Sequence, residues 1–146
     1  MTPSTLRFFS GLALFCFLSV VIINICSHFG IVIFKSITFF FQAFVILMAI
    51  PLVNMCNKTM PNGSNGNLVH IFSATNGKYL FVLALITIYG FINFFYFIHK
   101  TKPFPRGEAP TDIVSGIFSS LQMVFVFLEY IIASALLKIT YKHKVI

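Results

Sequence analysis

The stretch IVSGIFSSLQMVFVFLEYIIASALL, residues 113–137, carries a single charged side chain, Glu129, in an otherwise uncharged and largely apolar run. A helix that crosses a bilayer needs about 20 predominantly apolar residues, which this stretch provides. Three further stretches of spanning length precede it, at residues 8–26, 36–54 and 79–98. They are continuously apolar rather than alternating, and four strands could not close a barrel in lipid. The sequence therefore predicts an all-α membrane protein, a single bundle of four transmembrane helices with short loops that forms one domain.

The composition excludes the water-soluble classes of protein. Of the 146 residues, 58% are hydrophobic and 9% are charged, and the mean hydropathy is +0.95. A soluble domain is about 25% charged, so this chain has too little polar surface for a soluble enzyme, a secreted disulfide scaffold or a disordered tail. The formal net charge of +7 comes from Lys and Arg residues that lie outside the apolar stretches. This distribution indicates anchoring in lipid headgroups rather than binding to nucleic acid.

The longest polar stretch, residues 57–77, is rich in Asn and Gly and is predicted to be a loop. The connector at residues 27–35 is short, so we expect the first two spans to form a tight antiparallel hairpin. Arg7 followed by an apolar run resembles the start of a signal peptide, but small residues suited to cleavage are missing where the run ends. The segment at residues 8–26 is therefore predicted to be a retained anchor.

Two features predict which side of the membrane each end faces, and they conflict. Asn57 and Asn62 each begin a glycosylation acceptor tripeptide, which would place the 57–77 loop in the lumen. Lys144 and Lys142, third and fifth from the carboxyl end, resemble a dilysine retrieval signal that is read from the cytosol. A basic stop after the last span is the other interpretation of this tail. Two predicted crossings separate the loop from the tail, so only one of the two signals can operate.

The positive charges favour one of the two orientations. With both termini in the cytosol, six Lys and Arg residues lie on the inner side and four on the outer side, in line with the positive-inside rule. We therefore expect cytosolic termini and a place in the endoplasmic reticulum or early secretory pathway rather than the plasma membrane. A glycosylated, lumenal loop is the alternative. The inner set is Arg7, Lys58, Lys78, Lys138, Lys142 and Lys144, and the outer set is Lys35, Lys100, Lys102 and Arg106.

Polar residues follow one face of the predicted fourth span. Glu129 is the ionisable residue that lies deepest in a predicted span, and such residues are functional candidates because a charge is costly within a bilayer. On an adjacent strip, Gly116 and Ser120 form a small-xxx-small pair, which permits close approach of another helix. The residues that share the face of Glu129, at three- and four-residue steps, are Ser115, Ser119 and Gln122.

The other spans carry fewer polar residues. We expect the Glu129 face to point into the bundle, where polar groups of the other spans satisfy it. The candidates are Gln42 in the second span and Tyr89, Asn93 and Tyr96 in the third, and Asn24 lies near the end of the first span.

Residues suited to catalysis or to metal binding are not grouped in this sequence. The four histidines, at positions 28, 70, 99 and 143, lie outside the deep parts of the predicted spans, and the three cysteines form no CxxC pair. We therefore expect no enzyme activity, no bound metal and no cofactor.

The layout resembles that of small four-span membrane proteins with short loops and cytosolic ends, such as the MARVEL-type proteins. This resemblance assigns no role to individual residues. Small residues on helix faces and the small extramembrane mass favour a non-catalytic accessory subunit, scaffold or trafficking adaptor that packs against other membrane proteins, in a hetero-complex or a homo-oligomer. The alternative is a small transporter or oligomeric pore that uses Glu129, with Gln122 lining the same path. An enzyme that acts on lipid is the weakest of the three interpretations.

Overall fold

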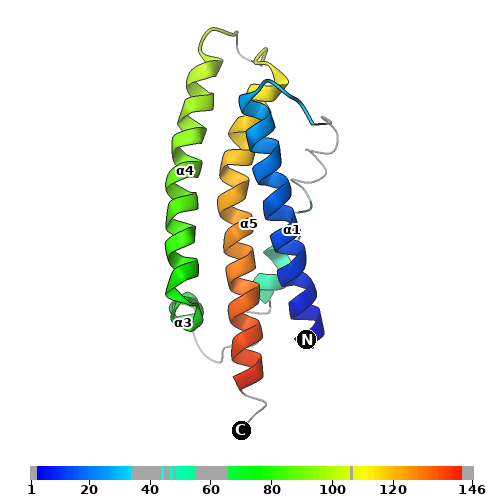
Figure 1. Ribbon diagram of the computed structural model, residues 1–146, viewed down its shortest axis with the longest axis vertical. Coiled ribbons are helices and arrows are strands. Elements are labelled where there is room, and N and C mark those ends of the chain that lie inside the picture. The colour runs from blue at the N-terminus through cyan, green and yellow to red at the C-terminus, as the bar shows by residue number, and fades with distance from the viewer. Residues whose placement is uncertain are drawn as a thin grey trace.

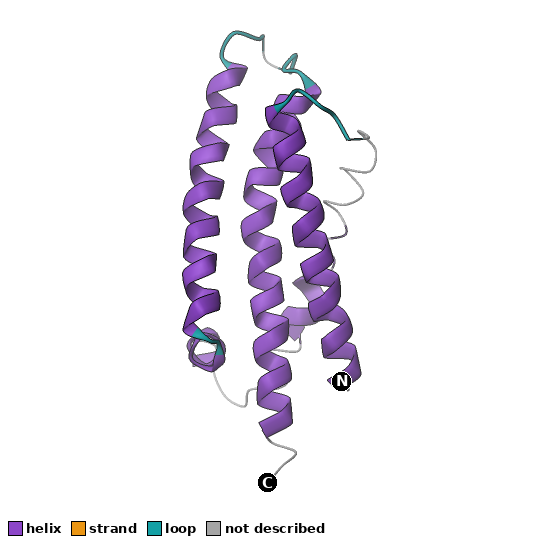
Figure 2. Cartoon of the chain, in the orientation of Figure 1, coloured by secondary structure: helices purple, strands orange, loops and turns teal. Residues whose placement is uncertain are grey.

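The computed structural model describes residues 3–33, 44, 47, 49–54, 66–105 and 107–142, and within these ranges the regular secondary structure is entirely α-helical (Figures 1 and 2). Three of the helices are long and apolar enough to span a membrane, which confirms the predicted class of an all-α, multi-pass membrane protein. The predicted span at residues 36–54 lies largely outside the described residues, although residues 49–54 are helical. The labelled helices are α1 (Pro3–His28), α3 (Gly66–Ala74), α4 (Gly77–Thr101) and α5 (Thr111–Lys142).

Each of the three long helices contains one predicted span and extends beyond it at both ends. Helix α4 shows how such an end is formed. Asn76 is its N-cap, and the Asn76 side-chain oxygen accepts a hydrogen bond of 3.1 Å from the backbone N–H of Lys78. At the other end, the backbone N–H of Lys102 donates to the carbonyl of His99. Hydropathy marks the thickness of the hydrocarbon layer, whereas the helix ends where its backbone is capped, a few residues further out.

Helix α5 is the central helix of the described part of the molecule, and it packs against both α1 and α4 (Figure 1). The packing of α1 on α5 is antiparallel, because Ser10 lies opposite Ser134 while Asn24 lies opposite Ser119. The packing of α4 on α5 is also antiparallel, so α1 and α4 run in the same direction (Figure 1). This arrangement fixes which residues of the three helices share a level in the membrane.

Small residues set the close approach of α4 to α5. A Cβ atom added at Gly90 of α4 would lie 2.7 Å from the backbone oxygen of Ser120 and 2.9 Å from a methyl carbon of Val124. Further along the same interface, the ring of Phe97 packs against Gly116 and fills the space that a side chain there would need. Gly116 and Ser120, predicted to permit close helix packing, therefore lie at a helix contact of this kind.

Helix α3 corrects the prediction that residues 57–77 form only a loop. Residues 66–74 of that stretch are helical, and α3 lies across one end of the bundle, so that Figure 1 views it along its axis. The side chain of Ile71 is fully buried, and the Lys138 ammonium group on α5 donates a 3.0 Å hydrogen bond to the carbonyl of Ala74 at the C-terminal end of α3. Gly and Asn in this stretch signalled turns, but burial against α5 and this capping contact stabilise a short helix.

One end of the bundle gathers the start of α1, helix α3, the start of α4 and the end of α5 (Figure 1). Arg7 on α1 donates a hydrogen bond to the hydroxyl of Tyr141 on α5, and its guanidinium lies 5.4 Å from the centre of the Tyr141 ring. The contact between Lys138 and Ala74 brings α3 to the same end. The start of α3 and the end of α5 therefore lie at the same end of the bundle, and the candidate spans α4 and α5 connect them.

The close contact at Gly90 gives a prediction about stability. We expect Gly90→Ala to lower the free energy of unfolding by about 1–3 kcal/mol, because the new methyl group cannot fit without separating α4 from α5. Unfolding of the purified protein in mixed micelles, followed by circular dichroism, measures this loss.

Gly11→Ala on α1 is the matched control, because no atom lies within 4 Å of a Cβ at that position. This change is expected to be neutral or to stabilise by up to about 1 kcal/mol, as alanine favours a helix. Equal stability of the two variants would contradict the close packing of α4 on α5.

Candidate functional site

The side chain of Asn24 forms hydrogen bonds to two other helices from a position that is 1% exposed. Its amide oxygen accepts from the hydroxyl of Tyr89 at 3.3 Å and from the amide nitrogen of Asn93 at 3.1 Å, both on α4. Its amide nitrogen donates to the hydroxyls of Ser119 at 3.0 Å and Ser120 at 3.1 Å, both on α5. One side chain of α1 therefore joins all three long helices. We call these five residues the Asn24 network.

The hydrogen bonds of the Asn24 network are mutually consistent. The hydroxyls of Ser119 and Ser120 each donate to the carbonyl of Gly116, at 3.2 Å and 2.6 Å, and are thereby free to accept from Asn24. A carboxamide offers two N–H groups and an oxygen with two lone pairs, and the contacts of Asn24 use both sides. Because apolar surroundings offer no water to replace these partners, the network favours the helix register in which all of them are made.

Glu129 lies on α5 at a different level from the Asn24 network. Its side chain is 7% exposed, and one carboxyl oxygen, Oε2, is buried without a hydrogen-bond partner among the residues that the structure describes. The carboxyl group lies within electrostatic range of the thiol of Cys16, close to the middle of α1. An unsatisfied buried polar atom costs about 1–3 kcal/mol, so this oxygen is an expensive feature of the fold.

Two of the candidate partners of Glu129, Tyr89 and Asn93, donate to Asn24 instead, while the candidate Gln42 lies outside the described residues. The reason is the antiparallel register. Ser119, which binds Asn24, precedes Glu129 by ten positions, a separation of about 15 Å at 1.5 Å per residue. Asn93 and Glu129 therefore lie at different depths although both face the interior of the bundle.

The other residues of the predicted polar face have separate surroundings. Ser115 is buried and Gln122 is half-buried. Tyr96 lies at the opposite end of the bundle from α3, where it stacks on His28 with ring centres 5.3 Å apart and where the ammonium group of Lys100 lies 4.6 Å from the ring centre. Such an aromatic and cationic pair is typical of the interface between hydrocarbon and headgroups. Gln42, Asn57, Asn62 and Lys144 lie outside the described residues, and Lys142 is the last residue of α5.

The central role of Asn24 was not predicted from the sequence. Asn24 lies near the end of a predicted span, where a polar residue is expected to face the headgroups. The available signal was that a carboxamide within an apolar helix needs partners, and that serines and an asparagine occur in two other spans. The sequence does not show whether Asn24 or Glu129 bonds to the polar residues of the other spans, because that depends on the register of the helices relative to one another.

Comparisons of the chain with protein-family models, with curated proteins and with solved structures gave no match.

The Asn24 network predicts a specific loss of stability. We expect Asn24→Leu to lower the free energy of unfolding by about 1–3 kcal/mol, because it leaves the amide of Asn93 without its acceptor. In the Asn24→Leu background, Asn93→Leu is expected to cost about 0.5–3 kcal/mol less than it does alone, as measured by a double-mutant cycle.

Ser19→Ala is the matched control, because the hydroxyl of Ser19 on the same helix donates only to the carbonyl of Phe15 within α1. Its effect is expected to stay within about 0.5 kcal/mol. Additive effects of the Asn24 and Asn93 substitutions would contradict a shared network.

Proposed function

We propose that the protein is a non-catalytic accessory subunit or scaffold that packs against a partner membrane protein through the outer face of α4. The observation that carries this proposal is a stripe of large apolar side chains, each more than half exposed, on the side of α4 away from α5. Successive members of the stripe are four, three, four and three positions apart. The stripe consists of Phe81, Leu85, Ile88, Ile92 and Phe95, and we call it the α4 stripe.

The spacing of the α4 stripe supports a helical partner. Steps of four and three residues are those by which side chains of one helix enter the spaces between side chains of a second helix. These are the steps of any single helix face, so the spacing is compatible with a helical partner, and the size of the five side chains supplies the contact. From Phe81 to Phe95 the stripe extends about 21 Å, so a partner helix would contact α4 over about two thirds of a hydrocarbon layer about 30 Å thick.

The use of the polar groups supports a structural role. In the Asn24 network, the buried side chains of Asn24, Asn93, Ser119 and Ser120, which come from three helices, bond to one another rather than line a path through the described part of the chain. This is the arrangement by which membrane helices associate, since interhelical hydrogen bonds and small residues replace the missing hydrophobic driving force.

A small transporter or oligomeric pore is the second candidate, and the unpartnered oxygen of Glu129 favours it. An acidic side chain held deep in a membrane without a described partner is suited to exchange a proton or to bind a cation. Such a path would run between copies of the chain or along α5 near Gln122.

We further propose that both termini face the cytosol, in a membrane of the early secretory pathway. Among the described residues, the end of the bundle that holds α3 carries Arg7, Lys78, Lys138 and Lys142, whereas the opposite end carries Lys100 and Lys102. This charge bias supports the cytosolic placement of that end, with Lys142 and Lys144 as a retrieval signal and the acceptor sites at Asn57 and Asn62 unused.

The accessory role predicts a stoichiometric hetero-complex when the chain is purified in mild detergent from its native membrane, measured by native mass. Ile88→Ala combined with Ile92→Ala is expected to release the partner, because the change removes two central contacts of the α4 stripe. Leu18→Ala combined with Ile22→Ala is the matched control, since these residues are similarly exposed on α1. A homo-oligomer that transports ions, and that loses transport but not assembly on Glu129→Gln, would overturn the accessory role and support the pore.

The proposed orientation predicts that glycosidase treatment leaves the electrophoretic mobility of the chain unchanged in a eukaryotic host. The positive control is an acceptor tripeptide on a long flexible insert after Gly107, at the end of the bundle opposite α3, which is expected to be glycosylated. A mobility shift of the wild-type chain that Asn57→Gln or Asn62→Gln removes would refute both the orientation and the retrieval signal.

A further inference from the structure

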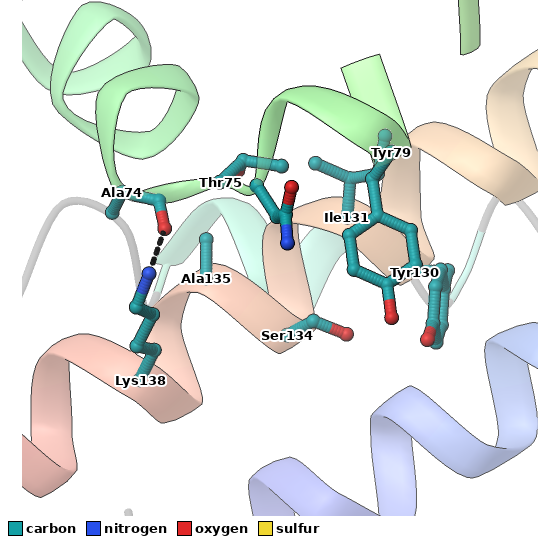
Figure 3. Close-up of a pocket in the computed structure, with 9 residues that line it drawn as sticks. Ala74, Thr75, Tyr79, Tyr130, Ile131, Ser134, Ala135 and Lys138 are labelled. Atoms are coloured by element: carbon teal, nitrogen blue, oxygen red, sulfur yellow. Dashed lines mark hydrogen bonds between the residues drawn. The ribbon is translucent and has the colours of Figure 1, made fainter. Parts of the chain in front are cut away.

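A cavity of about 100 Å³ lies at the α3 end of the bundle, between the end of α3, the start of α4 and the last turns of α5 (Figure 3). None of the residues of the Asn24 network and none of the α4 stripe lines it. Figure 3 shows the side chains of three helices converging on one space, with Lys138 on one side and the tyrosine pair on the other. The cavity is lined by Ala74, Thr75, Asn76, Tyr79, Tyr130, Ile131, Ser134, Ala135 and Lys138.

The shape of the cavity follows from the face that α5 presents to it. Residues 130, 131, 134, 135 and 138 recur at helical spacing, so they form one continuous strip. From Tyr130 to Lys138 this strip extends eight positions, about 12 Å along the helix axis. The small side chains of Ala74 and Ala135 leave the space open, and Ile131 gives it an apolar wall.

The position of the cavity is that of the membrane interface. Lys138 lies in the last turns of α5, and Lys78 lies in the first turn of α4. Tyr130 lies about two turns before Lys138 on α5, and its ring meets that of Tyr79, in the first turn of α4, edge to face with centres 6.0 Å apart. Tyrosine is enriched at the depth where acyl chains meet headgroups, so the cavity extends from the headgroup layer into the hydrocarbon.

A positive charge borders the outer end of the cavity, whose lining is otherwise mostly apolar. The ammonium group of Lys138 donates one hydrogen bond to the carbonyl of Ala74, which leaves two of its three N–H donors for another acceptor. The N-terminus of α4 at Asn76, which is the positive end of a helix dipole, also lies at the cavity. Among the described residues, no acidic side chain lines the cavity, since Glu108 and Asp112 lie at the opposite end of the bundle and Glu129 lies deeper within α5.

We propose that this cavity binds an anionic phospholipid. The phosphate accepts hydrogen bonds from Lys138 at the mouth of the cavity and lies near the N-terminus of α4, while a few carbons of one acyl chain enter the apolar space beside Ala135 and Ile131. A molecule with a charged head and an apolar chain fits, because the strip of α5 changes from the charged Lys138 to apolar side chains over about 12 Å along the helix axis. A free phosphate would leave the apolar part of the cavity unfilled. Phosphatidylcholine also offers a phosphate, but its quaternary ammonium group would add a positive charge beside Lys138 and the N-terminus of α4, which disfavours it relative to a lipid with net negative charge.

Lipid retention on the purified full chain tests the site. In native mass spectrometry with dioleoyl phosphatidylserine or dioleoyl phosphatidylcholine, the wild-type chain is expected to retain one phosphatidylserine in preference to phosphatidylcholine. Lys138→Gln is expected to lower phosphatidylserine retention about fivefold, the change that corresponds to about 1 kcal/mol for one lysine near anionic lipid. Lys138→Arg is expected to restore it.

Lys100→Gln is the matched control, because Lys100 is an interfacial lysine at the opposite end of the bundle. An equal loss in this variant would show a general effect of charge and would overturn the site. Equal retention of both lipids by the wild-type chain would overturn it as well.

The apolar part of the site has a test of its own. Ala135→Phe and the smaller change Ala135→Val fill the cavity without altering its charge, and both are expected to reduce phosphatidylserine retention, with the larger side chain giving the larger loss. Circular dichroism and a monodisperse elution profile establish that each variant is folded, and the Val variant serves if the Phe variant does not fold. Unchanged retention in a folded filled variant, or displacement of the lipid by millimolar glycerol 3-phosphate, would refute a phospholipid in this cavity.

Discussion

The carboxamide of Asn24 has to find its hydrogen bonds within the protein, and the arrangement of the three long helices depends on this requirement. Asn24 is buried in an apolar interior, and its partners lie on α4 and α5. Moving either helix by one turn, about 5.4 Å, would separate donors from acceptors and leave several polar groups unsatisfied. Apolar side chains alone do not impose a single register, because they pack acceptably in many different registers. The Asn24 network is therefore the contact that specifies how α1, α4 and α5 align.

Close packing of α4 on α5 complements this constraint. Gly90 and Gly116 allow backbone and ring atoms to approach where a larger residue would hold the helices apart. The same register leaves Glu129 at the level of Cys16, away from the polar side chains of α4. Two parts of α5 therefore differ in their polar contacts. Ser119 and Ser120 bond to α1, whereas the carboxyl oxygen Oε2 of Glu129 has no hydrogen-bond partner among the described residues.

The two ends of the bundle differ in structure and in charge. At one end, His28, Tyr96 and Lys100 form an interfacial cluster, and acidic residues lie nearby in the connector and the first turn of α5. At the other end, α3 lies across the bundle and is capped by Lys138, among positive charges without an acidic residue. Contact with a partner along α4 and binding of an anionic lipid beside α3 would use different surfaces, so the two proposals are compatible and can be tested separately.

The sequence by itself determined the membrane class, the places of the long helices, the small residues at their contacts and the polar residues available inside. These follow from local quantities, since the length of an apolar run must match the hydrocarbon thickness and a helix repeats its faces every 3.6 residues. The tertiary structure decided which polar residues meet, because Asn24, Asn93 and Ser119 come together only when three separate helices have a fixed register. It also decided that residues 66–74 are helical and that Ala74, Tyr79 and Lys138 surround one cavity. Contacts between distant segments depend on the relative depth and rotation of whole helices. The periodicity of one helix gives no information about either quantity.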